Sequence, residues 1–399
     1  MNGAALDRPA RRVFLDHNAT TPLRPAARAA MLDVLAASGN ASSVHADGRA
    51  ARGVVEAART AVARLVGAPS AAIVFTSGAT EANALVLHPD LEIAGQNQAC
   101  DVLVTSAVEH PSVLRGHRFP IAQVESIPVD ADGRLVLDAL EQVLAGHAAA
   151  GRRALVSLML ANNETGVIQP VTAASALAHA HGAVMHCDAV QAPGRMSLDM
   201  ATLGVDFLTI SSHKIGGPQG AGALVAAHPH SRPRVPLIAG GGQERGLRAG
   251  TENVAAIAGF GAAAVICAAQ GGEEAGRLRG LRDRLEKEIV ERFQGSQVAG
   301  AGVERLPNTT SVIFAGLKAE TLVIALDLAH VSVSAGSACS SGKVGPSHVL
   351  AAMGVGDAAA GGAIRLSLGW SSCDEDVDVA IAALGRVVPR LLNRPVRAA

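Results

Sequence analysis

The first 250 residues alternate between short runs of apolar, often β-branched residues and longer stretches in which apolar positions recur every three or four residues. The first pattern is typical of buried strands and the second of helices that pack on them. Because the two alternate, the sequence predicts an α/β fold with a mainly parallel sheet covered by helices on both faces. The predicted strands are 13–15, 73–75, 102–105, 154–160, 183–186, 205–210 and 223–226, and the predicted helices are 26–35, 48–66, 82–87, 137–144 and 173–181.

The pattern changes after residue 253. A long helical stretch, Val254–Arg292, has a charged face in its second half, and a mixture of short strands and helices follows it. We expect this helix to carry the change from a large domain, 15–258, to a smaller α+β domain, 259–399, with an N-terminal arm, 1–14, packed on the small domain. The strands predicted there are 310–314, 331–334 and Ala363–Ser367, and the helices are 320–327, 347–353 and a last one from residue 375.

Length and composition narrow the class of protein. At 399 residues, 49% hydrophobic and 17% charged, the chain is long enough for two cores and has the balance of a well-buried globular enzyme. The formal charge of −1 gives no electrostatic reason to expect nucleic acid or an anionic membrane as a partner. Aromatic residues make up only 2%, so base-stacking platforms are not expected. No apolar run approaches the roughly 20 residues of a membrane span, so no membrane partner is expected.

The cysteines indicate the redox setting. They form an odd set without a CxxC pair, which argues against a disulfide framework and against a closed zinc site. Residues 1–12 lack the apolar core of a signal peptide. These features predict a reduced, cytoplasmic setting. The cysteines are Cys100, Cys187, Cys267, Cys339 and Cys373.

A lysine stands just after the predicted strand 205–210, within Ser211-Ser212-His213-Lys214, and four glycines follow within eight residues. A second apolar run comes next, so a strand, a loop and another strand are predicted. A lysine at the end of a buried strand is costly unless its amine is paired, neutralised or covalently used. Considered alone, Lys214 would more simply be a lysine in a surface turn.

Other predicted strands end in polar residues too. Between the strand 73–75 and the helix 82–87, the turn Thr76-Ser77-Gly78-Ala79-Thr80-Glu81 offers backbone N–H groups, hydroxyls and a helix dipole to a phosphate, although an ordinary helix cap explains it equally well. In open α/β sheets, ligands bind at the carboxyl ends of the strands. The polar residues at these strand ends are Thr80, His110, Asn163, Asp188, Ser211, His213 and Lys214.

An amine, a carboxylate, a phosphate-binding turn and an imidazole together meet the needs of pyridoxal 5′-phosphate. The amine forms a Schiff base with this cofactor, the carboxylate keeps the pyridine nitrogen protonated, and a flat side chain covers the ring. Taken singly, Asp188 could cap a helix, His110 could be a satisfied loop histidine and Asn163 could form a turn. Those separate explanations do not account for their joint occurrence, so a pyridoxal-phosphate site is predicted.

At these residues the sequence resembles the cysteine desulfurases, which are class V, fold-type I pyridoxal-phosphate enzymes, over about residues 14–384. The order and number of the matching stretches make the resemblance highly specific. It implies a fold-type I transferase with a large, mainly parallel-sheet domain and a smaller α+β domain. The matching stretches are 15–22, 75–81, 109–110, 162–164, 188–191, 211–214, 240–251 and 334–341.

The resemblance also implies roles for single residues. Lys214 would hold the cofactor covalently, Asp188 would pair with the pyridine nitrogen, and His110 would stack on the ring. Gln191 would contact the ring oxygen, and Thr251 would reach over from the partner subunit of a homodimer. The remaining residues implied for binding the cofactor and its phosphate are Ala79, Thr80, Asn163, Ser211 and His213.

Cys339 narrows the predicted reaction. It stands among small and polar residues, 335–345, where a packed hydrophobe is not expected, and an exposed thiol is a candidate nucleophile. A buried core cysteine describes Cys187 and Cys267 better. By the resemblance, Cys339 takes the sulfur of L-cysteine as a persulfide, leaves L-alanine, and passes the sulfur to an acceptor such as an iron–sulfur scaffold protein. No permanent metal is expected, although Cys339 could ligate an iron–sulfur cluster transiently.

The substrate's carboxylate needs a fork-shaped cation. Arg365 has apolar neighbours on both sides and matches the carboxylate-binding arginine of the family, with Asn163 as its helper. The length of the loop around Cys339 matches the housekeeping and nitrogen-fixation branch of the family, which has a long, mobile cysteine loop.

Some positions depart from the family pattern. Gly216 and Gln219 stand where tyrosine and lysine are frequent, Trp370 replaces a frequent arginine, and Ala41 stands where proline is common. Gly216 and Trp370 could alter loop closure or the choice of sulfur acceptor. Two alternatives remain: a selenocysteine lyase or aminotransferase of the same fold, of which an aminotransferase would not need Cys339, and a scaffold protein that keeps the fold without cofactor chemistry.

Overall fold

The computed structural model describes residues 12–336 and 347–392. A seven-stranded sheet forms its centre, with β2 (Ile73–Thr76), β5 (Val102–Ser106), β6 (Val124–Ile127), β7 (Ala154–Met159), β8 (Val184–Asp188), β9 (Phe207–Ser211) and β10 (Gly222–Ala226). The strand order is β2-β10-β9-β8-β7-β5-β6. Only β10 is reversed, being antiparallel to both of its neighbours, so the sheet is mainly parallel as the sequence predicts.

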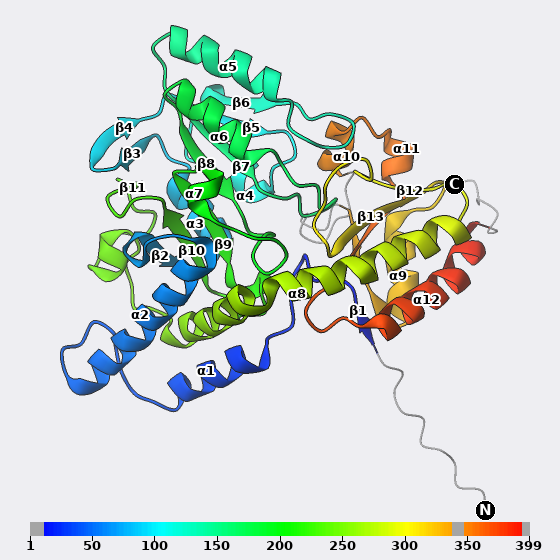
Figure 1. The fold of residues 1–399 in the computed structure, drawn as a ribbon, viewed down its shortest axis with the longest axis horizontal. Helices are drawn as coiled ribbons and strands as arrows, with labels where there is room; N and C mark the ends of the chain where they lie inside the picture. Colours follow the sequence, from blue (N-terminus) through cyan, green and yellow to red (C-terminus); the bar gives the residue numbers. More distant parts are fainter. Residues whose placement is uncertain (1–11, 337–346, 393–399) are drawn as a thin grey trace, which may run out of the picture.

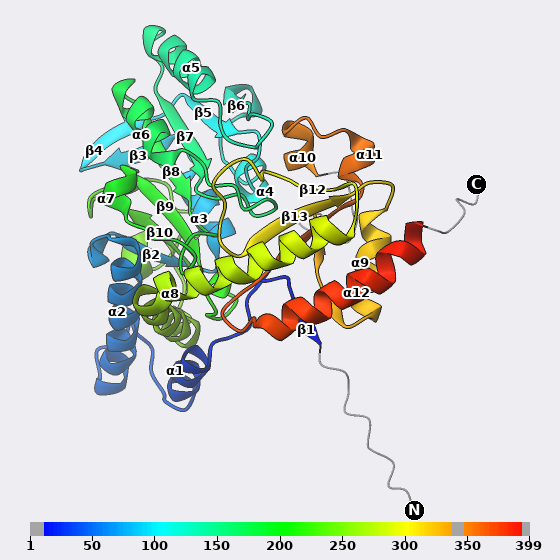
Figure 2. The same ribbon diagram turned by 45° about the vertical axis from the view of Figure 1, so that its right-hand side comes forward.

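Helices cover both faces of this sheet (Figures 1 and 2). Since successive side chains of a strand point to opposite faces, Phe75 packs in one apolar cluster and Val74 in another. The first cluster includes side chains of α2 (Ala46–Val66), α5 (Leu137–Ala149), α6 (Val171–Ala180) and the first part of α8 (Val254–Arg292). The second includes side chains of α3 (Ala79–Val86) and α4 (Pro111–Leu114).

A second sheet comes from the C-terminal part of the chain, in the order β12 (Ser296–Val298), β13 (Thr309–Phe314), β16 (Ala363–Ser367) and β15 (Ser334–Ala335). All of its neighbouring strands are antiparallel. It shares an apolar cluster with α9 (Ala319–Leu328), α12 (Asp374–Leu392) and the second half of α8. The other elements are α1 (Pro25–Leu35), α7 (Met200–Leu203), α10 (His348–Ala352), α11 (Asp357–Ala360), and a small sheet of β11 (Arg232–Pro233), β3 (Asp90–Ile93) and β4 (Gln96–Ala99).

Helix α8 belongs to both cores. Figure 1 shows it running from the helices on the large sheet to the small sheet. Its buried side chains up to Cys267 pack in the core of the large sheet, and those from Leu278 onward pack with the small sheet. The limits expected for the two domains, 15–258 and 259–399, stay a prediction.

The start of the described chain packs with its C-terminal part. β1 (Val13–Phe14) pairs in parallel with β14 (Val331–Ser332), and Val13 lies in the apolar cluster of the small sheet. Residues 1–11 of the predicted N-terminal arm lie outside the described residues.

Some predicted elements need correction. α3 begins at Ala79 and not at residue 82, because Ala79, Thr80 and Glu81 of the predicted turn form the first turn of the helix. β3, β4, β6, β11 and β12 were not predicted; Gln96–Ala99, for example, has no apolar run to reveal a strand. The predicted strand 331–334 is two short strands, β14 and β15, because its two parts pair with β1 and β16 respectively.

The expectation that no apolar run approaches the length of a membrane span was wrong. Residues 254–272 carry no charged side chain. Within the described parts of the chain, α8 is by length and composition the one helix able to cross a membrane, and half of its most apolar window is buried inside the protein. It packs against α1 and α2, so the apolar length of α8 has a structural reason within the fold.

A buried ion pair holds β2, the strand that leads into the predicted phosphate turn. Glu244 accepts hydrogen bonds from Nη2 and Nη1 of Arg59 at 2.8 and 2.9 Å and from the backbone N–H of Phe75 at 2.9 Å. The Glu244 side chain is 2% exposed, whereas Glu56, the second carboxylate on Arg59, is 52% exposed.

Replacing Glu244 by glutamine therefore leaves the buried charge of Arg59 without its buried partner. We expect Glu244→Gln to lower the free energy of unfolding by about 3 kcal/mol or more, measured by denaturant titration. The matched control, Glu56→Gln, removes an exposed partner of the same arginine and should cost less than about 1 kcal/mol. Equal losses in the two variants would contradict this assignment.

Candidate active site

A cavity of about 550 Å³ lies where the strands of the large sheet end. This volume is typical of sites for small molecules and cofactors, which span roughly 300–1,000 Å³. Ten of the predicted site residues line it, from both parts of the chain: Ala79, Thr80, His110, Asn163, Asp188, Gln191, Ser211, His213, Lys214 and Arg365. The structure thus brings together residues that are almost 290 positions apart (Ala79 to Arg365).

Lys214 ends the short 3-10 turn Ser212–Lys214, directly after β9. Because β10 runs back beside β9, the glycine-rich loop that connects them lies at the end of β9 and not on a face of the sheet. The Nζ atom of Lys214 donates hydrogen bonds to the backbone carbonyls of Asn18 and Ala19, at 2.5 and 2.8 Å. The amine is therefore held at the cavity wall by peptide oxygens.

Asp188 is the last residue of β8 and is buried. Its Oδ2 accepts a hydrogen bond from Nδ2 of Asn83 at 2.8 Å, and its Oδ1 accepts one from the backbone N–H of Val190 at 3.0 Å. Nδ2 of Asn83 also donates to Oγ of Ser112 at 2.9 Å. These donors fix the carboxylate without a direct cationic partner among the described salt bridges.

His110 precedes α4 and caps it, since its Nδ1 accepts a hydrogen bond from the backbone N–H of Ser112 at 3.1 Å. Burial lowers the pKa of this imidazole, with Lys214 and His348 adding to the effect and Asp188 opposing it. The ring is therefore a neutral, flat side chain on the cavity wall.

The turn between β2 and α3 forms another part of the wall. Gly78 precedes the helix and Ala79 begins it, with no side chain capping the helix N-terminus. The backbone N–H of Ser77 is already used, because it donates to Glu81 at 2.8 Å. A Cβ on Gly222 would lie 2.6 Å from the carbonyl carbon of Gly78, so β10 starts close against this turn.

His213 and Ser211 line the same cavity as the turn. Nδ1 of His213 lies 3.2 Å from Oγ1 of Thr20. Burial lowers the pKa of His213 to about 4, helped by the charges of Lys214 and Arg195, so this imidazole is neutral at neutral pH. A neutral ring can donate one hydrogen bond to an anion without bringing a charge of its own.

The donor set fits pyridoxal 5′-phosphate. The N-terminus of α3, with Thr80 and neutral His213 nearby, suits the phosphate. Asp188 and the flat ring of His110 suit the pyridine, and the Lys214 amine suits the aldehyde. By contrast, no cluster of three or more His, Cys, Asp or Glu side chains that could hold a metal ion occurs within 12–336 and 347–392.

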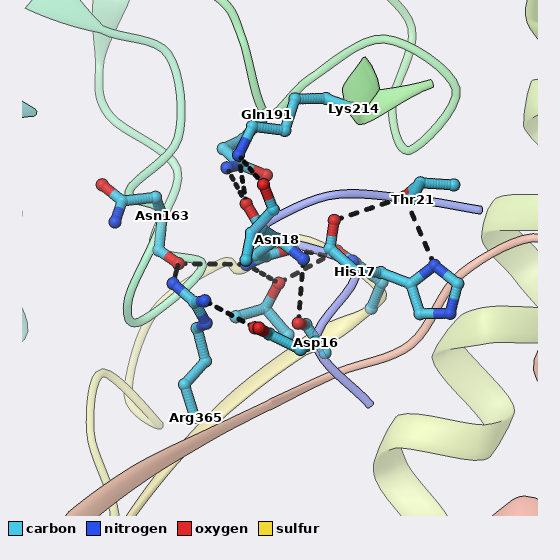
Figure 3. Close-up of polar contacts among 12 residues, drawn as sticks. Asp16, His17, Asn18, Thr21, Asn163, Gln191, Lys214 and Arg365 are labelled. Atoms are coloured by element: carbon cyan, nitrogen blue, oxygen red, sulfur yellow. Dashed lines mark hydrogen bonds and ion pairs between the residues drawn. The ribbon is translucent and has the colours of Figure 1, made fainter. Parts of the chain in front are cut away.

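Asn18, which was not among the predicted site residues, lies at the centre of the polar contacts in Figure 3. Its backbone carbonyl accepts from Lys214 and, at 3.1 Å, from Nε2 of Gln191. Its Nδ2 donates to the backbone carbonyl of Asn163 at 3.1 Å and to Oγ1 of Thr309 at 2.9 Å. Its other partners are Asn308, which donates to Oδ1, and Ser367, whose Oγ accepts from the backbone N–H.

Arg365 comes from β16 of the small sheet, yet it lines the same cavity. Its Nη2 donates to Oδ1 of Asp16 at 2.8 Å, and its Nη1 donates to the backbone carbonyl of Asn163 at 3.0 Å. Nε of Arg365 is buried and has no hydrogen-bond partner within the described parts of the chain. The guanidinium is therefore anchored on two sides, and its Nε–H is available to a ligand.

Sequence reasoning missed Asp16, Asn18 and Asn83 as site residues. Asp16 and Asn18 stand in 15–22, which supports the resemblance, but no periodicity assigns a role to polar residues after so short a strand. The signal available was their place after a buried strand, which is the position that identified seven of the other site residues. Asn83 lies inside a helix and offered no comparable signal.

One described site residue, Thr251, is not among the cavity-lining side chains, and another predicted site residue cannot be placed. Thr251 lines a neighbouring hollow of about 190 Å³, which shares Ser77 and Gly220 with the cavity. Its contribution from a partner subunit stays a prediction. Cys339 lies outside the described residues, which break off at 336 and resume at 347.

Glu164 is a buried carboxylic acid next to Asn163. Its Oε2 accepts a hydrogen bond from Oγ of Ser347 at 2.5 Å. Burial raises the pKa of Glu164 to about 7, although the Ser347 hydrogen bond and the Arg365 charge act in the opposite direction. Near neutral pH this carboxyl is close to half protonated.

Two departures from the family pattern, Gly216 and Trp370, meet at one side chain, Arg24. A Cβ on Gly216 would lie 2.6 Å from Cγ of Arg24, and the Arg24 guanidinium lies 5.5 Å from the centre of the Trp370 ring. Nη2 of Arg24 also donates to both carboxylate oxygens of Glu274 at 2.9 Å. The glycine therefore leaves room for a buried arginine that the tryptophan covers.

The other two departures lie elsewhere. Gln219 lines the cavity, so it is placed to contact a bound molecule. Ala41 is buried in the core of the large sheet and does not line the cavity.

The fold and the donor set define a fold-type I enzyme, and comparison with known proteins agrees. The chain belongs to the aminotransferase class-V family, whose model matches residues 13–379. This membership confirms the resemblance and the fold class that the sequence predicts.

Individual relatives narrow the class. Over 386 residues, 95% of this chain and 96% of that protein, the chain is 44% identical to the "Cysteine desulfurase" of Cereibacter sphaeroides. It is 40% identical to the "IscS-like cysteine desulfurase" of Mycobacterium tuberculosis, over 97% of this chain and 98% of that protein. Among solved structures, the NifS-like protein from Rickettsia africae matches with a TM-score of 0.85 and 34% identity, over 95% of this chain and 100% of that chain.

The contact between Gly216 and Arg24 predicts a loss of stability on adding one methyl group. Gly216 has φ +83° and a crowded Cβ position, whereas Gly182 has φ +69° and no atom within 4 Å of its Cβ position. Both alanine variants carry the cost of a left-handed backbone. Gly216→Ala should lose about 1–3 kcal/mol more than Gly182→Ala in denaturant titration, because it also overpacks the site. Equal losses would show that Arg24 moves aside freely.

The raised pKa of Glu164 predicts a pH-dependent contribution to stability. Below its ordinary pKa of about 4.5 the acid is neutral in both the folded and the unfolded state. Its contribution to the free energy of unfolding falls as the pH rises above that value and is lost once the pH has passed the folded-state pKa of about 7. Glu164→Gln cannot ionise, so between pH 5 and pH 8 it should gain up to about 3 kcal/mol relative to the parent protein. Denaturant titrations at both pH values measure this. The control Glu141→Gln, at an exposed position, should show no such gain.

Proposed function

We propose that this protein is a pyridoxal-phosphate-dependent cysteine desulfurase, which converts L-cysteine to L-alanine and carries the released sulfur on Cys339. The observation that carries the proposal is the single cavity onto which Lys214, Asp188 and Arg365 converge from two sheets. A cofactor amine partner, a carboxylate for the ring nitrogen and a carboxylate-binding arginine are the groups that amino-acid chemistry on this cofactor requires. Family membership and relatives bearing the name cysteine desulfurase support the same reaction.

The residues that would hold the cofactor come from several strand ends. Lys214 would bind it covalently, the turn at Ala79 and Thr80 would bind its phosphate, and Asp188 would hold a proton on the ring nitrogen. When bound, the cofactor supplies an electron sink next to the substrate's α-carbon. His110 would cover one face of the ring and shield it from water.

Substrate recognition would depend on Arg365. Its Nε, buried and without a partner among the described residues, and its Nη groups suit a carboxylate, which forms paired hydrogen bonds with a guanidinium. The carbonyl of Asn163 holds Nη1 and so helps to orient the fork. Recognition of an α-amino acid follows from a carboxylate site beside the amine site.

The sulfur step would use the thiol of Cys339. The thiolate attacks the substrate sulfur, a new S–S bond forms, and the substrate's C–S bond breaks. One L-cysteine and one Cys339 thiol give one L-alanine and one Cys339 persulfide, so atoms and electrons balance without an external oxidant or reductant. The persulfide then passes its outer sulfur to an acceptor protein, for which we propose an iron–sulfur scaffold.

We also infer a cytoplasmic homodimer, with Thr251 of each chain completing the partner's site. Apolar side chains support an interface: Leu32, Leu35 and Val265 are exposed on α1 and α8. A hollow of about 360 Å³, lined mainly by apolar residues of α1, α2 and α8, lies on this face.

The decisive variant is Cys339→Ser. The purified protein should produce L-alanine from L-cysteine, and Cys339→Ser should lower this rate roughly a thousandfold or more, because the nucleophile is lost. Cys373→Ser replaces a partly exposed cysteine that does not line the cavity and should keep the activity of the parent protein. Alanine and persulfide are measured separately.

Retention of full activity by Cys339→Ser would overturn the proposed sulfur step and favour a lyase or aminotransferase of the same fold. Absence of cofactor binding by the parent protein, measured by absorbance after adding pyridoxal 5′-phosphate, would overturn the enzyme assignment altogether.

A further inference from the structure

The proposed function gives no role to one charged contact at the site, the pair between Asp16 and Arg365. Asp16 follows β1 and forms an isolated parallel bridge with Ser367 of β16. Its Oδ1 accepts from Nη2 of Arg365 at 2.8 Å, and the two side chains are 20% and 2% exposed. Figure 3 shows the carboxylate on one side of the guanidinium and the carbonyl of Asn163 on the other.

The position of Asp16 shows whether it competes with a ligand for Arg365 or holds Arg365 in place for the ligand. A carboxylate that competed with a ligand would stand where the ligand binds, but Arg365 lines the cavity and Asp16 does not. The hydrogen bond from Nη2 therefore holds the guanidinium from outside the cavity, while Nε has no partner in 12–336 and 347–392. Asp16 therefore does not occupy the Nε–H donor, with which a ligand carboxylate could form a hydrogen bond.

The planar guanidinium of Arg365 needs two hydrogen-bond acceptors to fix the orientation of its plane. The carbonyl of Asn163 accepts from Nη1 alone, so without a second acceptor the guanidinium can turn about that single bond. Paired hydrogen bonds to a carboxylate require the fork and the carboxylate to lie in one plane, which makes recognition sensitive to this rotation.

We propose that Asp16 is a positioning residue, which holds Arg365 in the plane that receives the α-carboxylate of the substrate and thereby sets the affinity for amino acids. This inference rests on the proposed function, since it assigns Arg365 to the carboxylate. It concerns a contact between the residues that follow β1 and those of β16, so the N-terminal part of the described chain takes part in substrate recognition.

Two variants and a matched control test the role of Asp16. Asp16→Ala removes the acceptor, and KM for L-cysteine should rise at least about tenfold, which corresponds to about 1.4 kcal/mol. Asp16→Asn keeps an oxygen acceptor without the charge and should raise KM about threefold, a partial rescue. The control Asp327→Ala breaks another Asp–Arg pair, with exposed Arg12 at 2.5 Å, and should leave KM unchanged.

A binding measurement separates positioning from general damage. Cofactor-loaded protein is titrated with L-alanine and with ethylamine, which is alanine without its carboxylate, and absorbance reports binding. In Asp16→Ala the Kd for alanine should rise about tenfold, while the Kd for ethylamine and the affinity for the cofactor should not change. An equal rise for both amines would indicate damage to the whole site and overturn the proposal.

The remaining outcomes are also decisive. Unchanged binding of alanine would overturn the proposal, and tighter binding would show that Asp16 competes with the ligand. If Asp16→Ala does not fold, Asp16→Asn alone tests the proposal, through the ratio of its Kd for alanine to its Kd for ethylamine. A parent protein that makes no alanine from cysteine would overturn the proposed function, whereas the alanine-to-ethylamine ratio still tests Asp16.

Discussion

Asn18 is the buried residue through which the two sheets of this molecule share one cavity wall. Its backbone carbonyl accepts hydrogen bonds from Lys214 and Gln191, which follow strands of the large sheet, and its side-chain amide donates to Thr309 of the small sheet. Asn18, Gln191 and Thr309 are buried, and an unsatisfied buried donor or acceptor costs about 1–3 kcal/mol. The two sheets therefore cannot shift against each other here without losing several hydrogen bonds at once. Arg365 can reach the site of Lys214 because of this restraint.

Several buried, positively charged side chains lie around Asn18. Arg195 is buried, and burial together with the nearby charge of Arg365 lowers its pKa to about 10, which still leaves it charged at neutral pH. It donates to Oε1 of Gln191 and to the carbonyl of His17 and so orients the Gln191 amide. Burial, with the charges of Arg195 and Arg24, lowers the pKa of His17 to about 3, so this ring stays neutral. Anionic groups such as phosphate and carboxylate are the complement of this charge distribution.

Much of the fold and of the site could be predicted from periodicity. The boundaries of α8 and β16 are those expected, because a long amphipathic run and a short apolar run between polar residues leave little choice. Strand-end chemistry found seven of the cavity's lining residues, and the family resemblance added Ala79, Gln191 and Arg365. Asp16 and Asn18 escaped, because their role comes from partners about 145 to 350 residues away, and no local pattern encodes such partners. Gly216 and Trp370 likewise appear unrelated until Arg24 brings them together.

The sequence by itself determined the alternation of strands and helices, the residue types at the strand ends and hence the cofactor chemistry, because these depend on local propensity and on a sheet edge common to all parallel strands. Only the tertiary structure decided that Arg365 of the small sheet faces the cavity of the large one, that Asp16 anchors it, and that a carboxyl as deeply buried as Glu164 has a pKa near neutrality. Those properties depend on distance and desolvation, which exist only after the chain has packed.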